Sequence, residues 1–243
     1  MTRLLNGIVA FGSALLLAVT LIGAGFAAVA IPDAATATLS RAFSGCDQPN
    51  TPFTADELAS MAIAGKRYTF DDNDREKLDA AIAEANAAAE ADGRAGTLTR
   101  ESAARSLPAD AISHLDDVYR VASAAKPALA IVAALCIAGL AHVAVRISRR
   151  ALGRTLMAGG GLVLAAFFAL GAWAAIDFDG LFAAFHSLFF QAGTWTFPYD
   201  SLLITLYPTA FWMGMGGIWL AVTCGLSILA VLIGFTLGHK QHD

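Results

Sequence analysis

The sequence predicts an all-α membrane protein, a bundle of four transmembrane helices with a small extracytoplasmic domain between the first two. Three observations predict this fold. Of the 243 residues, 57% are hydrophobic and only 15% are charged, with a mean hydropathy of +0.60, whereas soluble domains carry about 25% charged residues. Four long apolar runs account for the difference, and basic residues gather at their ends on one side. The formal net charge of -4 offers no basic surface for nucleic acid.

The first apolar run covers residues 6–31 and contains no charged residue. Crossing about 30 Å of hydrocarbon takes roughly 20 helical residues, so this run is long enough to span a membrane. A cleavable signal peptide is the alternative, because Ala28, Val29 and Ala30 resemble a cleavage site. Signal peptides have apolar cores of roughly 7–15 residues, however, which favours an uncleaved span.

Residues 32–126 form a polar segment with 10 Lys and Arg against 16 Asp and Glu. Thr54 followed three residues later by Glu57 predicts a capping box at a helix start. An alanine-rich, charged stretch predicts a solvated helix over 71–91, followed over 91–102 by a loop with little to anchor it. Another helix is expected after Pro108. This segment is the predicted extracytoplasmic domain, for which a mixed α+β structure is an alternative.

Three further spans are predicted over residues 127–147, 156–176 and 211–237. Arg3, Lys240 and the arginines between 146 and 154 then fall on one side, which the positive-inside rule assigns to the cytoplasm. Both termini are therefore expected in the cytoplasm, with 32–126 and 177–210 outside. No charged residue lies deep in a span, which argues against an ion pathway or a proton-coupled transporter.

Residues 177–210 are predicted to be an interfacial loop on the outer side. Aromatic rings that carry one polar atom gather at the membrane–water boundary, and this stretch and the start of the last span hold four of them, Trp195, Tyr199, Tyr207 and Trp212. His186 and Asp200 lie among them. The stretch is too polar for a span, and a titratable imidazole among bulky apolar neighbours is its most unusual feature.

Several common sites are not indicated by any motif. Nucleotide-binding loops, serine-hydrolase elbows and zinc-protease motifs do not occur. The three cysteines lack metal-ligand spacing, so neither a metal site nor a cofactor is predicted, and Cys46 is interpreted as a free thiol. Three consecutive glycines, 159–161, are interpreted as a close helix contact or a flexible point.

His114 and His186 differ from the other three histidines, because each precedes a span on the predicted outer side and has acidic neighbours. Asp117 lies three residues after His114 and shares its helix face. Asp179 and Asp200 flank His186 in sequence. Two imidazoles brought together could perform acid–base chemistry near neutral pH. From spacing alone, two histidines that merely tether loops to the bundle are the preferred interpretation.

A resemblance to a known family covers nearly the whole chain. The stretch DFDGLFAAFHSLFF over 177–190, with Trp195, Asp200, Ile204, Pro208 and Phe211 after it, resembles the Lit family of bacterial membrane proteins, the lipoprotein intramolecular transacylases. The shorter motif HLDDV over 114–118 is similar to the family's other signature. The order of span, outer domain, two spans, aromatic histidine loop and last span is also similar to the family's.

The resemblance implies a four-helix membrane bundle that carries a small outward-facing domain. It implies an enzyme of the bacterial cytoplasmic membrane that moves the sn-2 acyl chain of a lipoprotein's diacylglyceryl group to the α-amino group of the same N-terminal cysteine, giving a lyso-form lipoprotein. Its catalytic histidines correspond to His114 and His186.

The remaining expectations concern neighbours and partners. A diacylated lipoprotein N-terminus and membrane lipid are the expected partners, without cofactor, nucleic acid or partner protein. Asp117, Asp179, Asp200 and Trp195 are predicted to support the histidines. Phe185, Phe189, Phe190 and Trp212 are predicted to line an acyl-chain vestibule or to anchor the interface. The alternative function is a non-enzymatic membrane scaffold with a partner-binding outer domain.

Overall fold

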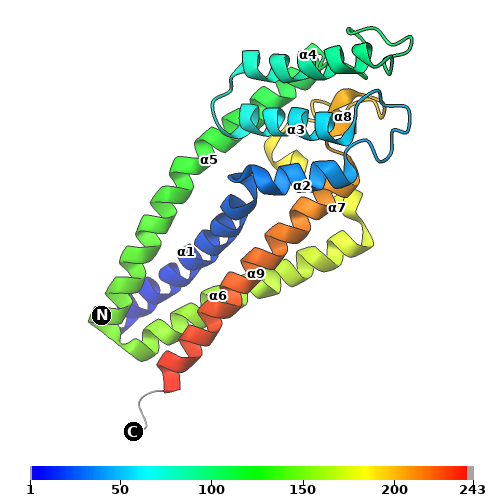
Figure 1. Ribbon diagram of the computed structural model, residues 1–243. Coiled ribbons are helices and arrows are strands. Elements are labelled where there is room, and N and C mark those ends of the chain that lie inside the picture. Colours follow the sequence, from blue (N-terminus) through cyan, green and yellow to red (C-terminus); the bar gives the residue numbers. More distant parts are fainter. Residues whose placement is uncertain (1, 240–243) are drawn as a thin grey trace. The chain divides into compact units, whose positions relative to one another are not determined.

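A computed structural model describes residues 2–239, so Lys240 lies outside the described residues. All regular elements within this range are helical (Figure 1). The α+β alternative for the extracytoplasmic segment is therefore not borne out, which agrees with its alanine-rich sequence and lack of strand alternation. The elements are α1 (Thr2–Ala30), α2 (Asp33–Phe43), α3 (Ala55–Phe70), α4 (Arg75–Ala91), α5 (Ala109–His142), the π-helical turn η1 (Val143–Ile147), α6 (Arg149–Ile176), α7 (Phe178–Phe189), α8 (Leu202–Leu206) and α9 (Thr209–His239).

Four helices of the described chain are long and apolar enough to cross a membrane, the number predicted from the sequence. They cover Arg3–Ala30, Ala109–Ile147, Arg149–Ile176 and Thr209–Gly238. The chain divides into two compact units. The span unit comprises residues 2–28, 125–181 and 218–239, and the histidine unit comprises 29–124 and 182–217.

Small residues let the helices of the span unit approach closely. A Cβ on Gly159 would meet the Ala14 carbonyl oxygen of α1 at 2.9 Å, and a Cβ on Gly160 would meet the Ser227 carbonyl oxygen of α9 at 2.7 Å. Gly161 faces open space. Close approach through glycine is a common way for helices to pack in lipid. The first two glycines therefore form the predicted close contact, and any larger residue at either position would push two helices apart.

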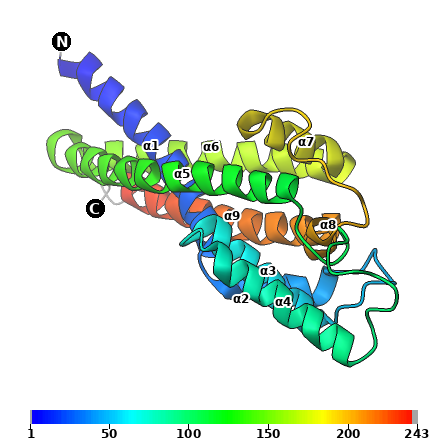
Figure 2. The same cartoon turned by 90° about the horizontal axis from the view of Figure 1, so that it is seen from above.

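The helices α2, α3 and α4 of the histidine unit lie side by side, as both ribbon views show (Figures 1 and 2). The predicted capping box begins α3: Glu57 N–H donates to Thr54 Oγ1 at 3.3 Å, and Thr54 N–H donates to Glu57 Oε2 at 2.7 Å. Lys66 of α3, which is buried, donates to the Ile31 carbonyl at 2.6 Å and to Asp33 at 3.2 Å. These bonds fix α2, a helix that the sequence did not predict, against α3.

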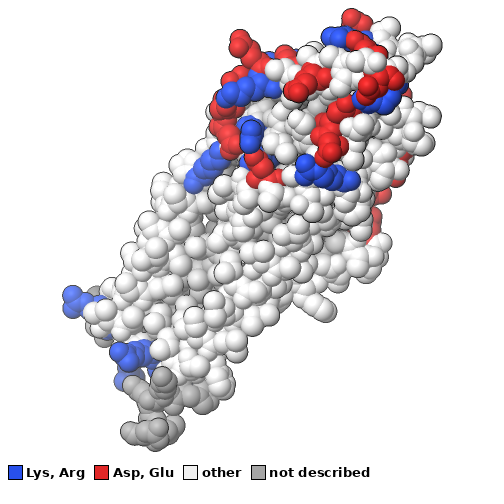
Figure 3. All heavy atoms as spheres, in the orientation of Figure 1, with Lys and Arg blue, Asp and Glu red and all other residues white. Residues whose placement is uncertain are grey.

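Charged side chains of both signs cover the region of α2, α3 and α4, whereas the long helices are almost free of them (Figure 3). The unit core lies beneath these charges and joins α3, α4, the first turns of α5 and α8. The short helix α8 is held by backbone: Leu202 N–H donates to the Ala103 carbonyl at 2.6 Å, and Gly45 N–H donates to the Thr205 carbonyl at 2.8 Å. Its fixed position determines where the preceding residues 190–201 lie.

The loop after α4 is firmly anchored, so the prediction of a weakly held segment over 91–102 is wrong. Arg94 forms an ion pair with Glu57 at 2.8 Å. The loop also supplies the Leu98 carbonyl as a partner for Arg105, which is 2% exposed and bonds Asn86 Oδ1 at 2.7 Å, Glu90 at 2.6 Å and that carbonyl at 2.5 Å. Composition gave no sign of this arrangement, because the partners come from α3 and α4.

Replacing Arg105 by methionine is expected to destabilise the histidine unit by about 3–5 kcal/mol. The change keeps the apolar bulk but leaves Asn86 and the Leu98 carbonyl buried without their partner. Thermal unfolding of the purified variant measures the effect. Arg100→Met is the matched control, since Arg100 pairs with the same Glu90 on the exposed side and should change stability little. Equal losses in both variants would contradict the special role of Arg105.

Helix α5 begins directly after Pro108, as predicted, but continues without a break through Pro127. The predicted second span began at Pro127, whereas the helix already runs through this residue. An internal proline removes one backbone hydrogen bond but is tolerated in membrane helices. The helix that carries His114 near its start is thus continuous with the apolar segment of the second candidate span.

Candidate active site

Helix α7 presents His186 in a defined orientation. Asp177 precedes the helix, and its Oδ1 accepts the Gly180 N–H at 2.8 Å, as a capping residue does. One turn before His186 on the same helix lies Phe182, whose carbonyl oxygen is 2.8 Å from His186 Nδ1. A carbonyl oxygen only accepts, so Nδ1 carries the proton in this contact. In the neutral ring, the lone pair is then on Nε2.

Helix α5 holds His114 in the first turns of the helix, where His114 is 9% exposed. Its Nδ1 is buried and has no hydrogen-bond partner among the described residues. Two residues later, Asp116 accepts the Tyr68 hydroxyl at 2.5 Å and ties α5 to α3. Burial raises the pKa of Tyr68 to about 12, and the bond to Asp116 acts in the same direction. The position of His114 is therefore set by a neutral phenol bonded to a carboxylate.

The two imidazoles meet inside a group of aromatic side chains. Their ring centroids are 6.2 Å apart with an interplanar angle of 28°. Phe190 contacts both rings, with centroid distances of 5.0 Å to His114 and 5.6 Å to His186. Four side chains form what we call the aromatic cage: Phe182, Phe190, Trp195 and Phe197. At this separation, one substrate atom or one water could touch both imidazoles.

The indole of Trp195 is the cage member with unused hydrogen-bonding capacity. Its ring lies 4.8 Å from the His186 ring, between centroids, at 32°. The Nε1 atom is buried and has no partner among the described residues. Buried N–H groups are nearly always paired in folded proteins. The unpaired indole N–H of Trp195, whose ring contacts His186, therefore indicates a place where a polar group of another molecule can be bound.

His114 lies outside the apolar part of its helix. A helix of 39 residues is about 58 Å long, roughly twice the hydrocarbon thickness. Its first half carries all the charged residues of α5, namely Asp110, Asp116, Asp117, Arg120 and Lys126, so the crossing segment is the uncharged half after Lys126. His114 thus lies in the polar half of α5, and His186 lies in the short helix α7, which is not one of the four candidate spans.

Burial favours the neutral form of both imidazoles. Desolvation lowers the pKa of His114 to about 4, with a smaller contribution in the same direction from His186, while Asp117 opposes it. Desolvation also lowers the pKa of His186, opposed by the bond to the Phe182 carbonyl. At neutral pH both rings are therefore uncharged, and each offers one acceptor nitrogen and one N–H.

Acid is expected to destabilise the protein through His114. With a pKa of about 4 in the folded state and about 6.5 when unfolded, the unfolded chain binds more protons between these values. The contribution of neutral His114 to the free energy of unfolding is then fully present above about pH 6.5. The free energy of unfolding falls by about 2 kcal/mol on going from pH 7 to pH 5. Thermal unfolding at several pH values measures this slope.

His114→Gln removes this titration and should flatten the slope over the same range, leaving the part due to His186. His142→Gln, a change at the other end of α5, is the control and should leave the slope as it is. A slope that is equally steep in all three proteins would contradict the assignment to His114.

The other predicted site residues are not all brought to the cage. Phe190 and Trp195 belong to it, and Phe185 lies beside it with its ring 5.7 Å from His186. Phe189 packs on Phe185 and Phe190. Trp212 contacts Phe182 at 6.0 Å and is partly exposed.

The carboxylates are placed differently from the aromatic residues. Asp117 forms an ion pair with Arg120 at 3.0 Å, and no hydrogen bond joins it to His114 within the described chain. Asp179 and Asp200 are exposed and make no hydrogen bond or ion pair with a described residue. Clusters of three or more metal-ligating side chains do not occur in residues 2–239.

Phe182 and Phe197 are cage residues that the sequence analysis did not single out. Phe182 lies four residues before His186, a spacing that puts both on one face if the stretch is helical. Because residues 177–210 were predicted to be a loop, this helical spacing was not considered. Phe197 lies in an irregular segment between α7 and α8, and no sequence pattern marks its contact with His114.

Both the sequence and the fold of this chain are similar to those of known proteins. Residues 94–212, which include both histidines, match the family described as lipoprotein intramolecular transacylase Lit. The solved structure of the membrane integral lipoprotein intramolecular transacylase Lit from Bacillus cereus is similar, with a TM-score of 0.74 and 17% identity over 98% of this chain and 97% of that chain. No curated protein matches.

Two further structures of the Bacillus cereus protein carry a histidine replaced by arginine or by alanine. The arginine variant has a TM-score of 0.68 and 17% identity over 99% of this chain and 95% of that one. The alanine variant has a TM-score of 0.70 and 16% identity over 99% and 96%. At such identities the likeness establishes the fold, and the family rests on the matched segment.

The candidate spans and the family match together identify a multi-pass integral membrane enzyme, a transacylase. The chain belongs to the Lit family of lipoprotein intramolecular transacylases. The family membership and the meeting of the two histidines both favour the predicted enzyme over the non-enzymatic scaffold.

Proposed function

We propose that the chain moves the acyl group on the sn-2 oxygen of a lipoprotein's diacylglyceryl cysteine to the α-amino group of that same cysteine. The product is a lyso-form lipoprotein with an amide-linked acyl chain and a free glycerol hydroxyl. The reaction takes place at the outer leaflet of a bacterial cytoplasmic membrane, with both chain termini in the cytoplasm. The observation that carries the proposal is the pair of neutral imidazoles, 6.2 Å apart, inside an aromatic cage.

His186 is the general base of this proposal. The α-amino nitrogen attacks the ester carbonyl carbon, and a C–N bond forms as Nε2 of His186 takes the amine proton. The hydrogen bond from Nδ1 to the Phe182 carbonyl supports this role, because it keeps the lone pair on Nε2 and helps to stabilise the imidazolium that forms. When the ester C–O bond breaks, the same proton passes to the departing glycerol oxygen.

His114 and Trp195 stabilise the negative charge of the tetrahedral intermediate, which forms after the amine attacks and before the ester bond breaks. The tetrahedral intermediate carries this charge on the former carbonyl oxygen, and hydrogen-bond donors aimed at that position lower the barrier. The unpaired Nε1–H of Trp195 and the unpaired Nδ1 of His114, as an N–H, would supply two such donors. Donors that need no reorganisation act most strongly in a site with little water, and the surrounding phenyl rings favour such a site.

No nucleophilic side chain is required by this reaction. Amine and ester belong to one substrate molecule, so the reacting groups are close once the substrate is bound, and proximity alone lowers the barrier substantially. The exposed rings of Phe185 and Phe189, next to the cage, would receive the acyl chains. The partial exposure of His186 and Trp195 leaves one side of the cage accessible to the substrate.

Mass spectrometry of a reporter lipoprotein tests the proposal. Its N-terminal lipopeptide is isolated from cells that express the native chain, His114→Ala or His186→Ala. Substrate and product are isomers, so fragmentation must locate the acyl group on nitrogen or on glycerol. The native chain is expected to give the N-acyl lyso-form, and both variants the unrearranged diacyl form.

His142→Ala is the matched control, a histidine of α5 outside the cage, and should behave as the native chain does. Absence of N-acylation by the native chain, with the protein shown to be folded in the membrane, would refute this function for the substrate used. N-acylation by both alanine variants would refute the histidine pair.

A further inference from the structure

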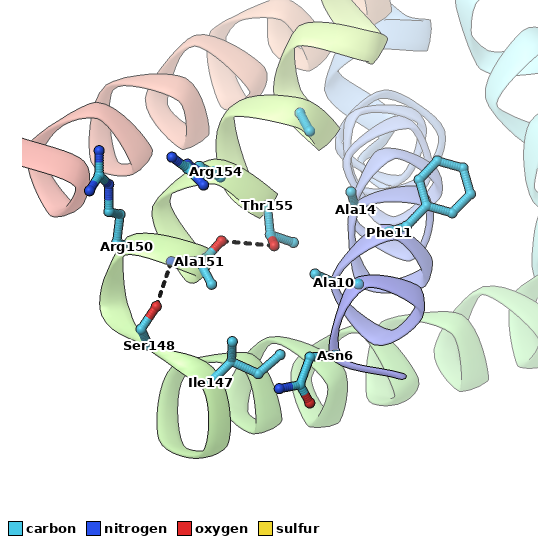
Figure 4. Close-up of a pocket in the computed structure, with 12 residues that line it drawn as sticks. Asn6, Ala10, Phe11, Ala14, Ile147, Ser148, Arg150, Ala151, Arg154 and Thr155 are labelled. Atoms are coloured by element: carbon cyan, nitrogen blue, oxygen red, sulfur yellow. Dashed lines mark hydrogen bonds between the residues drawn. The ribbon is translucent and has the colours of Figure 1, made fainter. Parts of the chain in front are cut away.

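An open groove in the span unit lies between the first turns of α1 and α6 and has a volume of about 470 Å³. Twelve residues line it, and most are small or apolar. They are Asn6, Gly7, Ala10, Phe11, Ala14, Ile147, Ser148, Arg150, Ala151, Arg154, Thr155 and Ala158. Figure 4 shows Ala10 and Ala14 of α1 across from Ala151 and Thr155 of α6. Small residues on both helices therefore line this groove.

Two arginines on α6 give one end of this groove a positive charge. Arg150 and Arg154 are one helical turn apart, both are exposed, and neither forms an ion pair with a described residue. Arg146 and Arg149 lie close by in sequence but do not line the groove. No Asp or Glu occurs among residues 1–32 or 118–176. Among the described residues, these two arginines are therefore exposed cations that can pair with an anionic ligand.

The two arginines favour a phosphate group as the ligand at this end of the groove. Guanidinium groups bind phosphate oxygens through paired, charge-assisted hydrogen bonds. The N-terminal end of α6, where Ser148 Oγ caps the Ala151 N–H at 3.0 Å, adds partial positive charge beside them. Apolar lining below a phosphate site matches a molecule with a charged head and a hydrocarbon tail, and basic pockets between membrane helices commonly bind such lipids.

We propose that this groove, between α1 and α6, binds an anionic phospholipid, with the phosphate on Arg150 and Arg154 and one acyl chain along Gly7, Ala10 and Ala14. Its net negative headgroup distinguishes this ligand from zwitterionic lipids. A second groove of about 480 Å³, between α6 and α9, is lined only by uncharged residues. That groove can take acyl chains but has nothing to select a headgroup.

Native mass spectrometry of the delipidated, detergent-solubilised protein tests the proposal. The probes are phosphatidylglycerol and phosphatidylcholine with identical acyl chains. The native protein is expected to bind phosphatidylglycerol about 30-fold more tightly, since two arginines near a membrane surface contribute about 1 kcal/mol each to binding of anionic lipid. The double variant R150Q/R154Q should lose this preference.

Two further variants keep the result specific. R146Q/R149Q removes the same charge beside the groove and should retain the preference within twofold. A Cβ on Gly7 would meet open space, so Gly7→Leu fills the groove without a clash and should weaken binding of both lipids. Glycerol 1-phosphate, which lacks acyl chains, should compete poorly.

Four outcomes would overturn the proposal. The native protein could bind both lipids equally, or the two double variants could lose the same affinity, which would indicate only a diffuse charge effect. Alternatively, Gly7→Leu could bind like the native protein, or glycerol 1-phosphate could displace the lipid at equal concentration. None of these results bears on the histidine pair, so this test is independent of the proposed reaction.

Discussion

Replacing His186 by asparagine is expected to abolish acyl transfer while leaving the fold intact. The asparagine amide places an N–H near the position of Nδ1, where it can still donate to the Phe182 carbonyl, but it has no atom at the position of Nε2. The base is lost and the structural bond is kept. We expect the rate to fall by about 10²–10⁴-fold, the usual contribution of general acid–base catalysis.

Single-turnover assays with a diacylated lipopeptide, combined with thermal unfolding, separate the two effects. The unfolding midpoint of His186→Asn should stay close to that of the native protein. Ser187→Ala is the matched control: its hydroxyl also bonds a carbonyl of α7, that of Ala184 at 2.7 Å, but its side chain is exposed. A rate within tenfold of native in His186→Asn would show that Nε2 is not the base.

The spans could be predicted from sequence because their signal is local. A run of about 20 apolar residues must be helical in a membrane, whatever it packs against. The capping box at Thr54 was predictable for the same reason, since both partners lie within one turn. Helix α2 was missed because it has only 11 residues, and its position depends on Asp33 meeting Lys66 and Arg67 of α3.

Tertiary contacts explain the remaining differences in the fold. Arg105 lies in a stretch of Gly, Ser, Thr and Arg that is typical of exposed loops, yet it is buried by Asn86 and Glu90 of α4. Only the folded chain brings these partners together. Similarly, Pro127 would end a helix in water, but in α5 it stands where an apolar segment continues the helix.

In the candidate site too, local features could be predicted from the sequence and tertiary contacts could not. Both histidines were found through motifs, and their meeting could not be derived from spacing, since 72 residues separate them. Asp117 was a reasonable neighbour of His114 by helical spacing, but Arg120 lies at the same spacing on the other side and is its ion-pair partner. Local periodicity gives candidates for a contact, and competition among charged partners decides which one forms.

Trp195→Phe is expected to lower turnover by about 10²-fold, the effect of losing one preorganised donor to an oxyanion. The phenyl ring keeps the aromatic contact with His186 and deletes only Nε1–H. KM should change little, because the N–H is proposed to act on charge that exists only in the transition state. Steady-state kinetics with the diacylated lipopeptide separate the two parameters.

The effect of Trp195→Phe on thermal stability is expected to be opposite to its effect on turnover. In the unliganded protein, Trp195 Nε1 is buried without a partner, a condition that costs about 1–3 kcal/mol. Deleting the N–H removes this cost, so the unfolding midpoint of Trp195→Phe should stay the same or rise. A structural tryptophan would instead lose stability and activity together, and that result would contradict the proposed donor.

Trp212→Phe is the matched control for this argument. Trp212 also contacts Phe182, but its indole nitrogen is not among the buried unpaired atoms, so the same substitution should leave turnover within a few-fold of native. If both variants lose turnover equally, packing of the indoles around Phe182 explains the effect. Loss of turnover only at Trp195, with stability retained, would mean that the protein keeps an unsatisfied donor in its resting state because the transition state uses it.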